Sequence, residues 1–310
     1  MIIPDWNGKP YHSLDYELKQ MFKEKVYKIA LNGGMTCPNR DGHVGTGGCI
    51  FCSSQGSGDF AGSARLSIAE QIRQGKADIS SKRPVHSYIA YFQAFTNTYA
   101  PVETLRALYM EAIADPEVKI LSIATRPDCL GADVLALLDE INHIKPVWVE
   151  LGLQTIHPET SAYIRRGYEL SVFEQAVKEL RAIGITVIVH TILYLPGETK
   201  DDMLDTIHYL NHMDIQGIKL QLLHVLTHTD LAADYEKHPF YIPDMQDYIQ
   251  FLGTCIAQLN PQIVIHRLTG DGPKDLLIAP LWTSNKRTVL NQLHSHLKEQ
   301  DIWQGKEYYV

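Results

Sequence analysis

Three of the chain's five cysteines, Cys37, Cys49 and Cys52, lie in one short, glycine-rich stretch. The spacing Cys-x11-Cys-x2-Cys places three soft thiolate ligands on one flexible loop, which suits zinc or an iron–sulfur cluster. Three thiolates complete neither a four-cysteine zinc site nor an all-cysteine cubane. One coordination position is therefore left for another molecule, as catalysis at a metal site requires.

His43 lies in the same loop and offers a second interpretation, because it could close a structural zinc site of three cysteines and one histidine. A disulfide is disfavoured, because the N-terminal residues carry neither the basic nor the apolar region of a secretory signal. From the cysteines alone, zinc and iron–sulfur both remain open.

The composition is that of an ordinary globular protein, with 310 residues, 45% of them hydrophobic and 21% charged. No run approaches the roughly eighteen apolar residues of a membrane span, and reduced cysteines predict a cytoplasmic location. The net charge of −8 argues against a protein that coats nucleic acid nonspecifically. A local basic patch is still compatible with this charge, and its candidates are Arg165-Arg166 and Lys286-Arg287.

Short apolar runs rich in β-branched residues alternate with helical patterns, which predicts βα units and a mostly parallel sheet. The expected strands are Val26–Leu31, Ser87–Phe92, Lys119–Ala124, Val147–Leu151, Thr186–Ile192, Ile218–Leu223 and Ile263–His266. Ser67 with Glu70 and Ser171 with Glu174 predict capping boxes at helix starts, and Gly184 predicts a helix end. Six or seven right-handed crossovers of this kind predict an α/β fold with a full or partial parallel barrel.

Polar side chains recur where the predicted strands end. They are Gln93, Arg126, Gln154, His190, Gln221 and His224. Active sites of parallel barrels lie at the carboxyl ends of the strands, so these residues should converge on one mouth. The cysteine loop follows the first strand and should open onto the same mouth.

With these residues in place, the chain resembles the radical S-adenosylmethionine (SAM) superfamily, in the branch of the radical domain of the Elongator catalytic subunit. The cysteine loop, with Phe51 before its last cysteine, matches that branch's elongated three-cysteine motif. Further matching blocks are Tyr91–Tyr99, Ser122–Asp128, Val149–Thr155 and Leu195–Glu198. The resemblance covers about residues 10 to 295. It implies a partial (β/α)6-type barrel in a single domain, with a core of about 20–230 and a C-terminal extension of about 231–310.

Within that branch, three blocks are similar to the stand-alone bacterial proteins of the MnmL type. The blocks are Asn39–Gly42, Gly56–Ala61 and Arg267–Pro273. This likeness implies modification of the tRNA wobble uridine, from 5-carboxymethylaminomethyl to 5-aminomethyl uridine. It also implies an electron donor such as flavodoxin or ferredoxin, and a methyltransferase that acts on the product.

The resemblance further implies roles for individual residues. Cys37, Cys49 and Cys52 would hold a [4Fe–4S] cluster, and S-adenosylmethionine would take the fourth iron. Phe51 would lie near the adenine, Gln93 at the methionyl amine, Arg126 at a carboxylate of cofactor or substrate, and Gln154 at the ribose. His190, Tyr194, Gln221 and His224 would line the substrate side, whereas Cys129 and Cys255 are interpreted as packing residues.

Three classes of function follow. The leading one is a radical enzyme that acts on tRNA. The second applies the same radical chemistry to a small metabolite, which the acidic charge would suit better. The third is a zinc-stabilised binding protein that uses the barrel as a scaffold.

Overall fold

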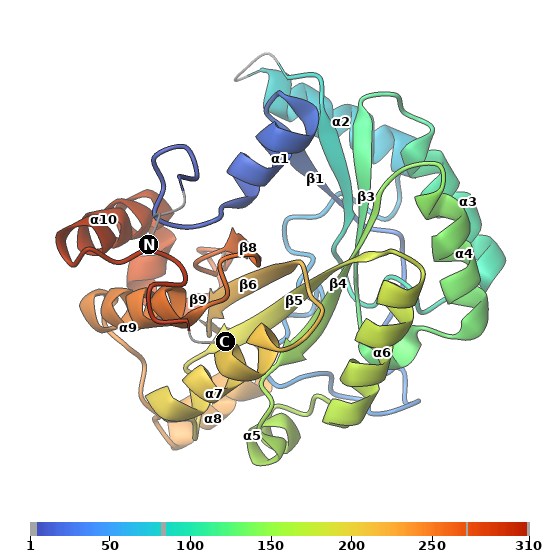
Figure 1. The fold of residues 1–310 in the computed structure, drawn as a ribbon. Helices are drawn as coiled ribbons and strands as arrows, with labels where there is room; N and C mark the ends of the chain where they lie inside the picture. Colours follow the sequence, from blue (N-terminus) through green and yellow to red (C-terminus); the bar gives the residue numbers. More distant parts are fainter. Residues whose placement is uncertain (1–4, 82–84, 271, 309–310) are drawn as a thin grey trace. The chain divides into compact units, whose positions relative to one another are not determined.

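A computed structural model describes residues 5–81, 85–270 and 272–308 (Figure 1). The chain forms two compact units. The cysteine-loop unit comprises Leu18–Gly152 and Gly167–Ile188, and the C-terminal unit comprises Met1–Glu17, Leu153–Arg166 and Val189–Val310. Each unit takes segments from more than one part of the chain. The predicted single domain, with a core of about 20–230 and a C-terminal extension of about 231–310, stays a prediction.

The cysteine-loop unit is built on parallel strands. They are β1 (Tyr27–Leu31), β2 (Tyr88–Phe92), β3 (Val118–Thr125) and β4 (Val147–Gln154), the last of which ends in the other unit. The helices of this unit are α2 (Ile68–Ser80), α3 (Val102–Ile113), α4 (Ala132–Asn142) and α6 (Leu170–Ala182), with the short helix η1 (Pro127–Cys129). All five residues of β2 are buried, as expected for a parallel strand that is covered on both faces.

A buried polar network ties three of these strands together. Lys28 Nζ on β1 donates to Glu150 Oε1 on β4 over 2.7 Å, and Ser122 Oγ on β3 donates to the same oxygen over 2.8 Å. The Lys28 ammonium also lies 4.7 Å from the centre of the Tyr91 ring on β2. A carboxylate as buried as Glu150 requires such partners, so the network fixes the strands that carry the cysteine loop.

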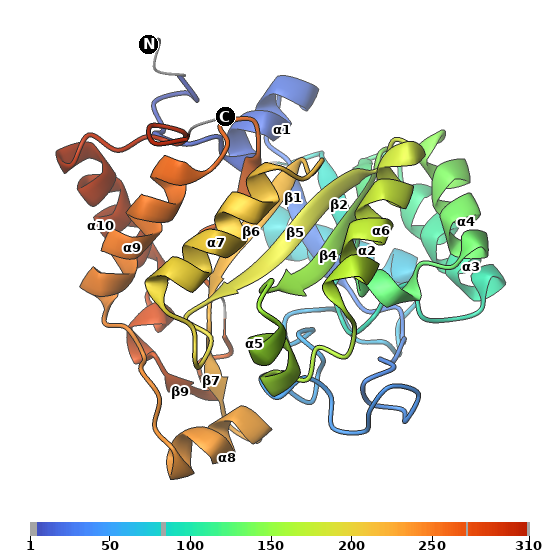
Figure 2. The same cartoon turned by 60° about the horizontal axis from the view of Figure 1, so that its bottom comes forward.

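The C-terminal unit contains most of the remaining elements (Figure 2). Its strands are β6 (Gly217–Leu222), β7 (Val225–Leu226), β8 (Val264–Arg267) and β9 (Leu277–Ala279), and its helices are α5 (Pro158–Tyr163), α7 (Lys200–Asn211), α8 (Asp230–Lys237), α9 (Met245–Gln258), η2 (Leu281–Ser284) and α10 (Lys286–Glu299). Helix α1 (Leu14–Phe22) and strand β5 (Thr186–Leu193) run across the division between the units. Strands β6 and β8 pair in parallel, β7 and β9 pair antiparallel, and α9 packs against α7 and α10.

The strand order of the main sheet is β1-β2-β3-β4-β5-β6-β8, which leaves β1 and β8 as its two edges. Each of the seven predicted strands is present. The predicted α/β fold with a partial parallel barrel is therefore confirmed. In the described residues, no helix combines the length and apolar character needed to cross a membrane.

The predicted helix boundaries are partly right. Ser67 caps α2, because its hydroxyl accepts the Glu70 N–H over 3.2 Å. The capping box predicted at Ser171 is wrong, since the N-cap of α6 is Glu169, two residues earlier, and it makes no side-chain cap. Gly184 follows the end of α6 with a φ of 73°, as predicted for a helix end.

Candidate metal centre at the cysteine loop

The loop after β1 folds back on itself through backbone hydrogen bonds. The N–H groups of Arg40 and Asp41 both donate to the Cys37 carbonyl, over 2.8 and 3.2 Å. The Gly48 N–H donates to the Asn39 carbonyl over 2.7 Å, and Cys52 N–H to the Cys49 carbonyl over 3.0 Å. These bonds bring the turn that follows Cys37 against residues 45–53, the arm of the loop, which carries Cys49 and Cys52.

The three thiols are partly accessible and none forms a disulfide. A hydrogen bond joins the thiols of Cys49 and Cys52, and the Sγ of Cys52 lies 3.8 Å from the Ser57 hydroxyl oxygen. The bond from Cys49, together with Ser57 and Arg40, lowers the pKa of Cys52, whereas the same bond and burial raise the pKa of Cys49. Soft, partly exposed sulfur donors of which one favours the thiolate fit a soft metal or an iron–sulfur cluster.

Arg40 clamps the arm of the loop. Its Nη2 donates to the carbonyl of Ser53 over 2.6 Å and to that of Cys52 over 3.3 Å. Its guanidinium carbon lies 5.6 Å from the centre of the Phe95 ring. Arg40 thus connects the cysteine loop to the segment that follows β2, although sequence reasoning gave it no role.

The loop also contacts the end of β2 directly. Gln93 Nε2 donates to the Ser57 carbonyl over 2.8 Å, and the Phe95 N–H donates to the Gly56 carbonyl over 2.9 Å. Gln93 therefore lies beside the cysteine loop, and its predicted role toward the cofactor stays a prediction. Phe51 is half-buried within the loop, and its position near an adenine stays a prediction.

Arg126 follows β3 and is 8% exposed. Its Nε and Nη2 donate to the two carboxylate oxygens of Asp128 over 2.9 and 2.7 Å, and its guanidinium lies 4.9 Å from the Tyr168 ring centre. One edge of the planar fork is therefore occupied by a carboxylate of the chain itself. A cofactor or substrate carboxylate would have to bind its other edge, so this role stays a prediction.

In the C-terminal unit, Gln154 has the clearest mark of a binding residue. It ends β4 with a φ of 68°, a conformation that non-glycine residues adopt mainly under constraint. Its Oε1 is buried without a hydrogen-bond partner in the described residues. An unpaired buried amide oxygen is costly, and a ligand hydroxyl would satisfy it.

The four residues predicted on the substrate side differ in their surroundings. Tyr194 is 5% exposed, packs among the rings of Tyr241, Tyr248 and Phe251, and donates its hydroxyl to Asp247 over 3.0 Å. This ring therefore belongs to the packing against α9. His190 and Gln221 are half-buried on β5 and β6, and His224 lies against Gly270 and Gly272. Their role toward substrate stays a prediction.

Of the basic pair Arg165-Arg166, Arg165 is exposed but Arg166 is buried, which corrects the prediction for Arg166. Arg166 is 3% exposed, and its Nη1 donates to the carbonyls of Leu153 and Thr155 over 3.0 and 2.6 Å. Arg165 forms an ion pair with Asp230. The sequence pattern could not show this, because a charged pair reads as a solvated surface unless the carbonyls that bind it are known.

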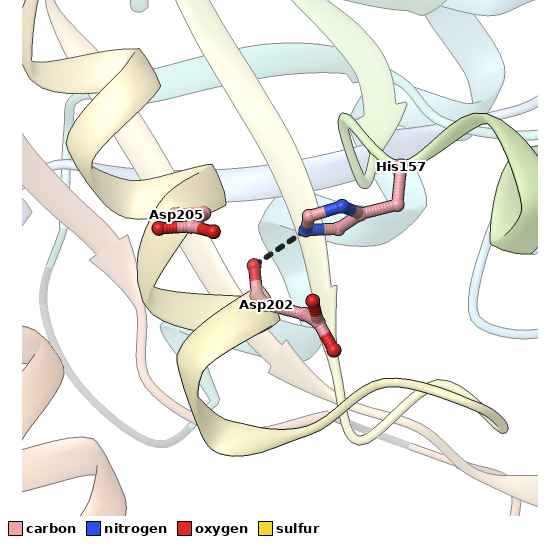
Figure 3. A group of neighbouring side chains, drawn as sticks. All are labelled: His157, Asp202 and Asp205. Carbon is pink, nitrogen blue, oxygen red and sulfur yellow. Dashed lines mark hydrogen bonds between the residues drawn. The ribbon is translucent and has the colours of Figure 1, made fainter.

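A second cluster of metal-ligand side chains lies in the C-terminal unit, where His157, Asp202 and Asp205 have ligand atoms within 4.8 Å of one another (Figure 3). His157 Nε2 bonds the Asp202 carbonyl over 2.7 Å. The Asp202 carboxylate accepts the N–H of Thr199 over 2.8 Å and its hydroxyl over 2.7 Å in the capping box of α7. The start of α7 accounts for these contacts, so we assign no metal to this group.

Nearby, Glu198 is a second residue that sequence reasoning missed. Burial raises the pKa of its carboxyl, although hydrogen bonds with Thr155 and Thr160 oppose that shift. Its Oε1 has no hydrogen-bond partner in the described residues. The only sequence signal was its place in the matching block Leu195–Glu198.

Comparison with known proteins gives consistent results. A family model described as the radical SAM superfamily matches residues 39–210, and one described as the radical SAM C-terminal domain matches residues 215–299. The uncharacterized protein YtqA of Bacillus subtilis is 44% identical, over 96% of this chain and 92% of its own length. Protein YhcC of Escherichia coli is 36% identical over 92% of both chains.

Among solved structures, an archaeal Elp3 of Methanocaldococcus infernus, with an N-terminal deletion, has a TM-score of 0.68 at 13% identity. The match covers 90% of this chain and 64% of that one. At this identity the likeness concerns the fold alone.

Proposed function

This chain belongs to the radical SAM superfamily, and from that premise we propose that it modifies the wobble uridine of tRNA, converting 5-carboxymethylaminomethyl to 5-aminomethyl uridine. The observation that carries the proposal is the likeness of the sequence blocks Asn39–Gly42, Gly56–Ala61 and Arg267–Pro273 to the MnmL-type proteins. The fold likeness to Elp3, over 90% of the chain, is compatible with it. A methyltransferase would act on the exposed amine, and the reaction would take place in the cytoplasm.

Membership of the family brings a [4Fe–4S] cluster and S-adenosylmethionine, and the donors of the cysteine loop fit this cluster. Cys37, Cys49 and Cys52 would hold three of its irons. When bound, the cluster and S-adenosylmethionine supply a carbon radical that abstracts hydrogen from substrate, after an electron arrives from a donor such as flavodoxin or ferredoxin. The protein would bind the cofactor and the substrate and orient them for this reaction.

The residues of this chain would do that positioning at the ends of the strands. Gln93, fixed to the loop through Ser57, would present its amide to the methionyl amine. Gln154 would bind ribose hydroxyls with the oxygen that has no partner in the described residues. Both side chains are held by strand ends rather than by free loops, which is where precise orientation is easiest to maintain.

The experiment that tests the proposal is nucleoside analysis of tRNA from cells that lack the protein. We expect 5-carboxymethylaminomethyl uridine to accumulate and the 5-aminomethyl and methylaminomethyl forms to disappear. A plasmid copy of the wild-type gene should restore the profile, and a Cys49→Ala copy should not. An unchanged profile, in cells without a second enzyme of this type, would contradict the tRNA proposal.

One observation favours a small metabolite as substrate instead. The net charge is −8, and in the candidate basic pair Arg165-Arg166 the side chain of Arg166 is buried while the exposed Arg165 forms an ion pair with Asp230. Lys286 and Arg287 at the start of α10 remain exposed. Binding of tRNA that weakens with salt, and that charge reversal at Lys286 and Arg287 reduces, would support the tRNA proposal over this alternative.

The cofactor pocket gives a separate prediction. Gln93→Ala and Arg126→Ala should each weaken S-adenosylmethionine binding by about ten- to a hundredfold, because a hydrogen bond to a charged group contributes roughly 1.5–3 kcal/mol. Iron content should stay at the wild-type level. Equilibrium dialysis of the reconstituted protein with labelled cofactor measures both variants.

Gln175→Ala is the matched control, because Gln175 is exposed on α6 and bonds only to Glu179 among the described contacts. Its cofactor affinity should equal that of the wild type. If Gln93→Ala and Arg126→Ala also bind the cofactor normally, both residues lie outside the pocket. For Arg126, this outcome would mean that its pairing with Asp128 is its whole function.

A further inference from the structure

The side chain of Asn39 contacts one of the cysteine sulfurs directly. Its Nδ2 donates to the Sγ of Cys49 over 3.5 Å, within the range for a hydrogen bond to sulfur. Asn39 is 4% exposed, although the loop around it is largely accessible. A primary amide that is buried against a metal-ligand sulfur is a fixed donor and not a surface group in exchange with water.

The surrounding chain holds this amide in place. The Asn39 carbonyl accepts the N–H of Gly48, next to Cys49, over 2.7 Å. A Cβ on residue 167 would lie 2.7 Å from the Asn39 Oδ1, which is too close. Glycine at position 167 therefore leaves enough space for the Asn39 side chain. The φ of Gly167 is +81°, which also favours glycine there. The hydrogen bond from Gly48 therefore fixes the backbone of Asn39, and Gly167 leaves space for its side-chain amide.

The neighbouring residue reinforces the position. Arg40 extends to the other cysteine of the Cys-x2-Cys pair, where it donates to the carbonyls of Cys52 and Ser53. Two consecutive side chains thus reach the two ends of the pair, an amide at the sulfur of Cys49 and a guanidinium at the backbone of Cys52. The arm of the loop cannot shift away from Asn39 without breaking the Arg40 bonds.

We propose that Asn39 sets the reduction potential of the cluster by donating a hydrogen bond to the Cys49 sulfur. Reduction adds negative charge to a cluster and its thiolate ligands, and hydrogen bonds to the sulfurs favour the more negative state. The Asn39 amide therefore raises the potential and eases the entry of the electron. Asn39 is a positioning and tuning residue, since it acts through Cys49 and not on the substrate.

This proposal depends on the cluster of the family and not on tRNA as substrate. Its failure is consequently distinguishable from failure of the proposed function, because the cluster potential is measured without tRNA. The competing explanation is that Asn39 only builds the loop. A structural role would change how much cluster is bound, but it would not change the potential of the cluster that remains.

The test is an EPR-monitored redox titration of anaerobically reconstituted full-length protein, with iron and sulfide measured on the same samples. Asn39→Ala removes the donor, and Asn39→Asp keeps the shape while replacing the donor by a negative acceptor. We expect the potential to shift to more negative values in the order wild type, Asn39→Ala, Asn39→Asp.

Asn32→Ala is the matched control, because Asn32 lies in the same segment but its side chain accepts from the Gly34 N–H over 3.0 Å. Its potential should equal that of the wild type. A wild-type potential in Asn39→Ala and Asn39→Asp with full iron content would overturn the proposal. If both Asn39 variants lost their iron or failed to fold, the proposal would also be overturned, since Asn39 would then have a structural role in the loop.

Discussion

Replacing Cys37, Cys49 or Cys52 by alanine is expected to abolish cluster assembly and the cleavage of S-adenosylmethionine to 5′-deoxyadenosine. The three thiolates are the iron ligands that the family implies, and no spare thiol is close in the loop sequence. The loss should be complete, because two thiolates leave the cluster with two open irons instead of one. Iron and sulfide content after anaerobic reconstitution, and 5′-deoxyadenosine formed with dithionite, measure the two effects.

The controls are the remaining two cysteines. Cys255 is fully buried in α9, and burial raises the pKa of its thiol. Burial, with the charge of Asp128, raises the pKa of the Cys129 thiol to about 12. Neither thiol belongs to the cysteine loop, since Cys129 lies in η1 and Cys255 in α9. Cys129→Ala and Cys255→Ala should keep full iron content, and a requirement for Cys129 would show that the ligand set is wrong.

The strands of this fold could be predicted because each is a short apolar run bounded by polar or turn residues. Val26–Leu31, for example, is interpreted correctly except at its first residue, since β1 begins at Tyr27. Helix starts were harder to place. Ser171 and Glu174 have the spacing of a capping box, yet residue 171 lies inside α6 and Glu169 occupies the N-cap position.

The cysteines of the candidate site could be predicted from their types and spacing, but the state of the neighbouring polar groups could not. Arg126 was expected to bind a carboxylate of cofactor or substrate, and in the structure its guanidinium binds the carboxylate of Asp128. Arg166 was expected at the surface, and backbone carbonyls bind it in the interior. Asn39 had no predicted role and contacts the sulfur of Cys49. Each outcome depends on how loops meet in space, which a pattern along one strand does not encode.

Gly56 shows the same limit, because only the structure reveals why this position needs glycine. A Cβ there would lie 2.3 to 2.7 Å from three atoms of the Phe95 ring, and the φ of Gly56 is +57°. The Phe95 ring lies against the guanidinium of Arg40, which in turn binds the carbonyls of Cys52 and Ser53. A displaced ring would therefore disturb the arm that carries Cys52.

Gly56→Ala is expected to lower the free energy of unfolding by about 2–5 kcal/mol, of which overpacking contributes roughly 1–3 and the left-handed backbone roughly 1–2. It should also leave most of the protein without cluster after reconstitution. Urea denaturation of the metal-free protein and its iron content after reconstitution measure the two effects separately.

Gly42→Ala is the matched control, since Gly42 lies in the same loop with a φ of +94° but has no heavy atom within 4 Å of the added Cβ. It should show only the backbone cost, about 1–2 kcal/mol, and bind iron normally. Equal losses in both variants would mean that the backbone conformation alone requires glycine and that the Gly56–Phe95 contact has no separate role. If the contact is what matters, adding Phe95→Ala to Gly56→Ala should remove the overpacking cost, yet iron binding should stay low, because Arg40 would have lost the ring that holds it over Cys52.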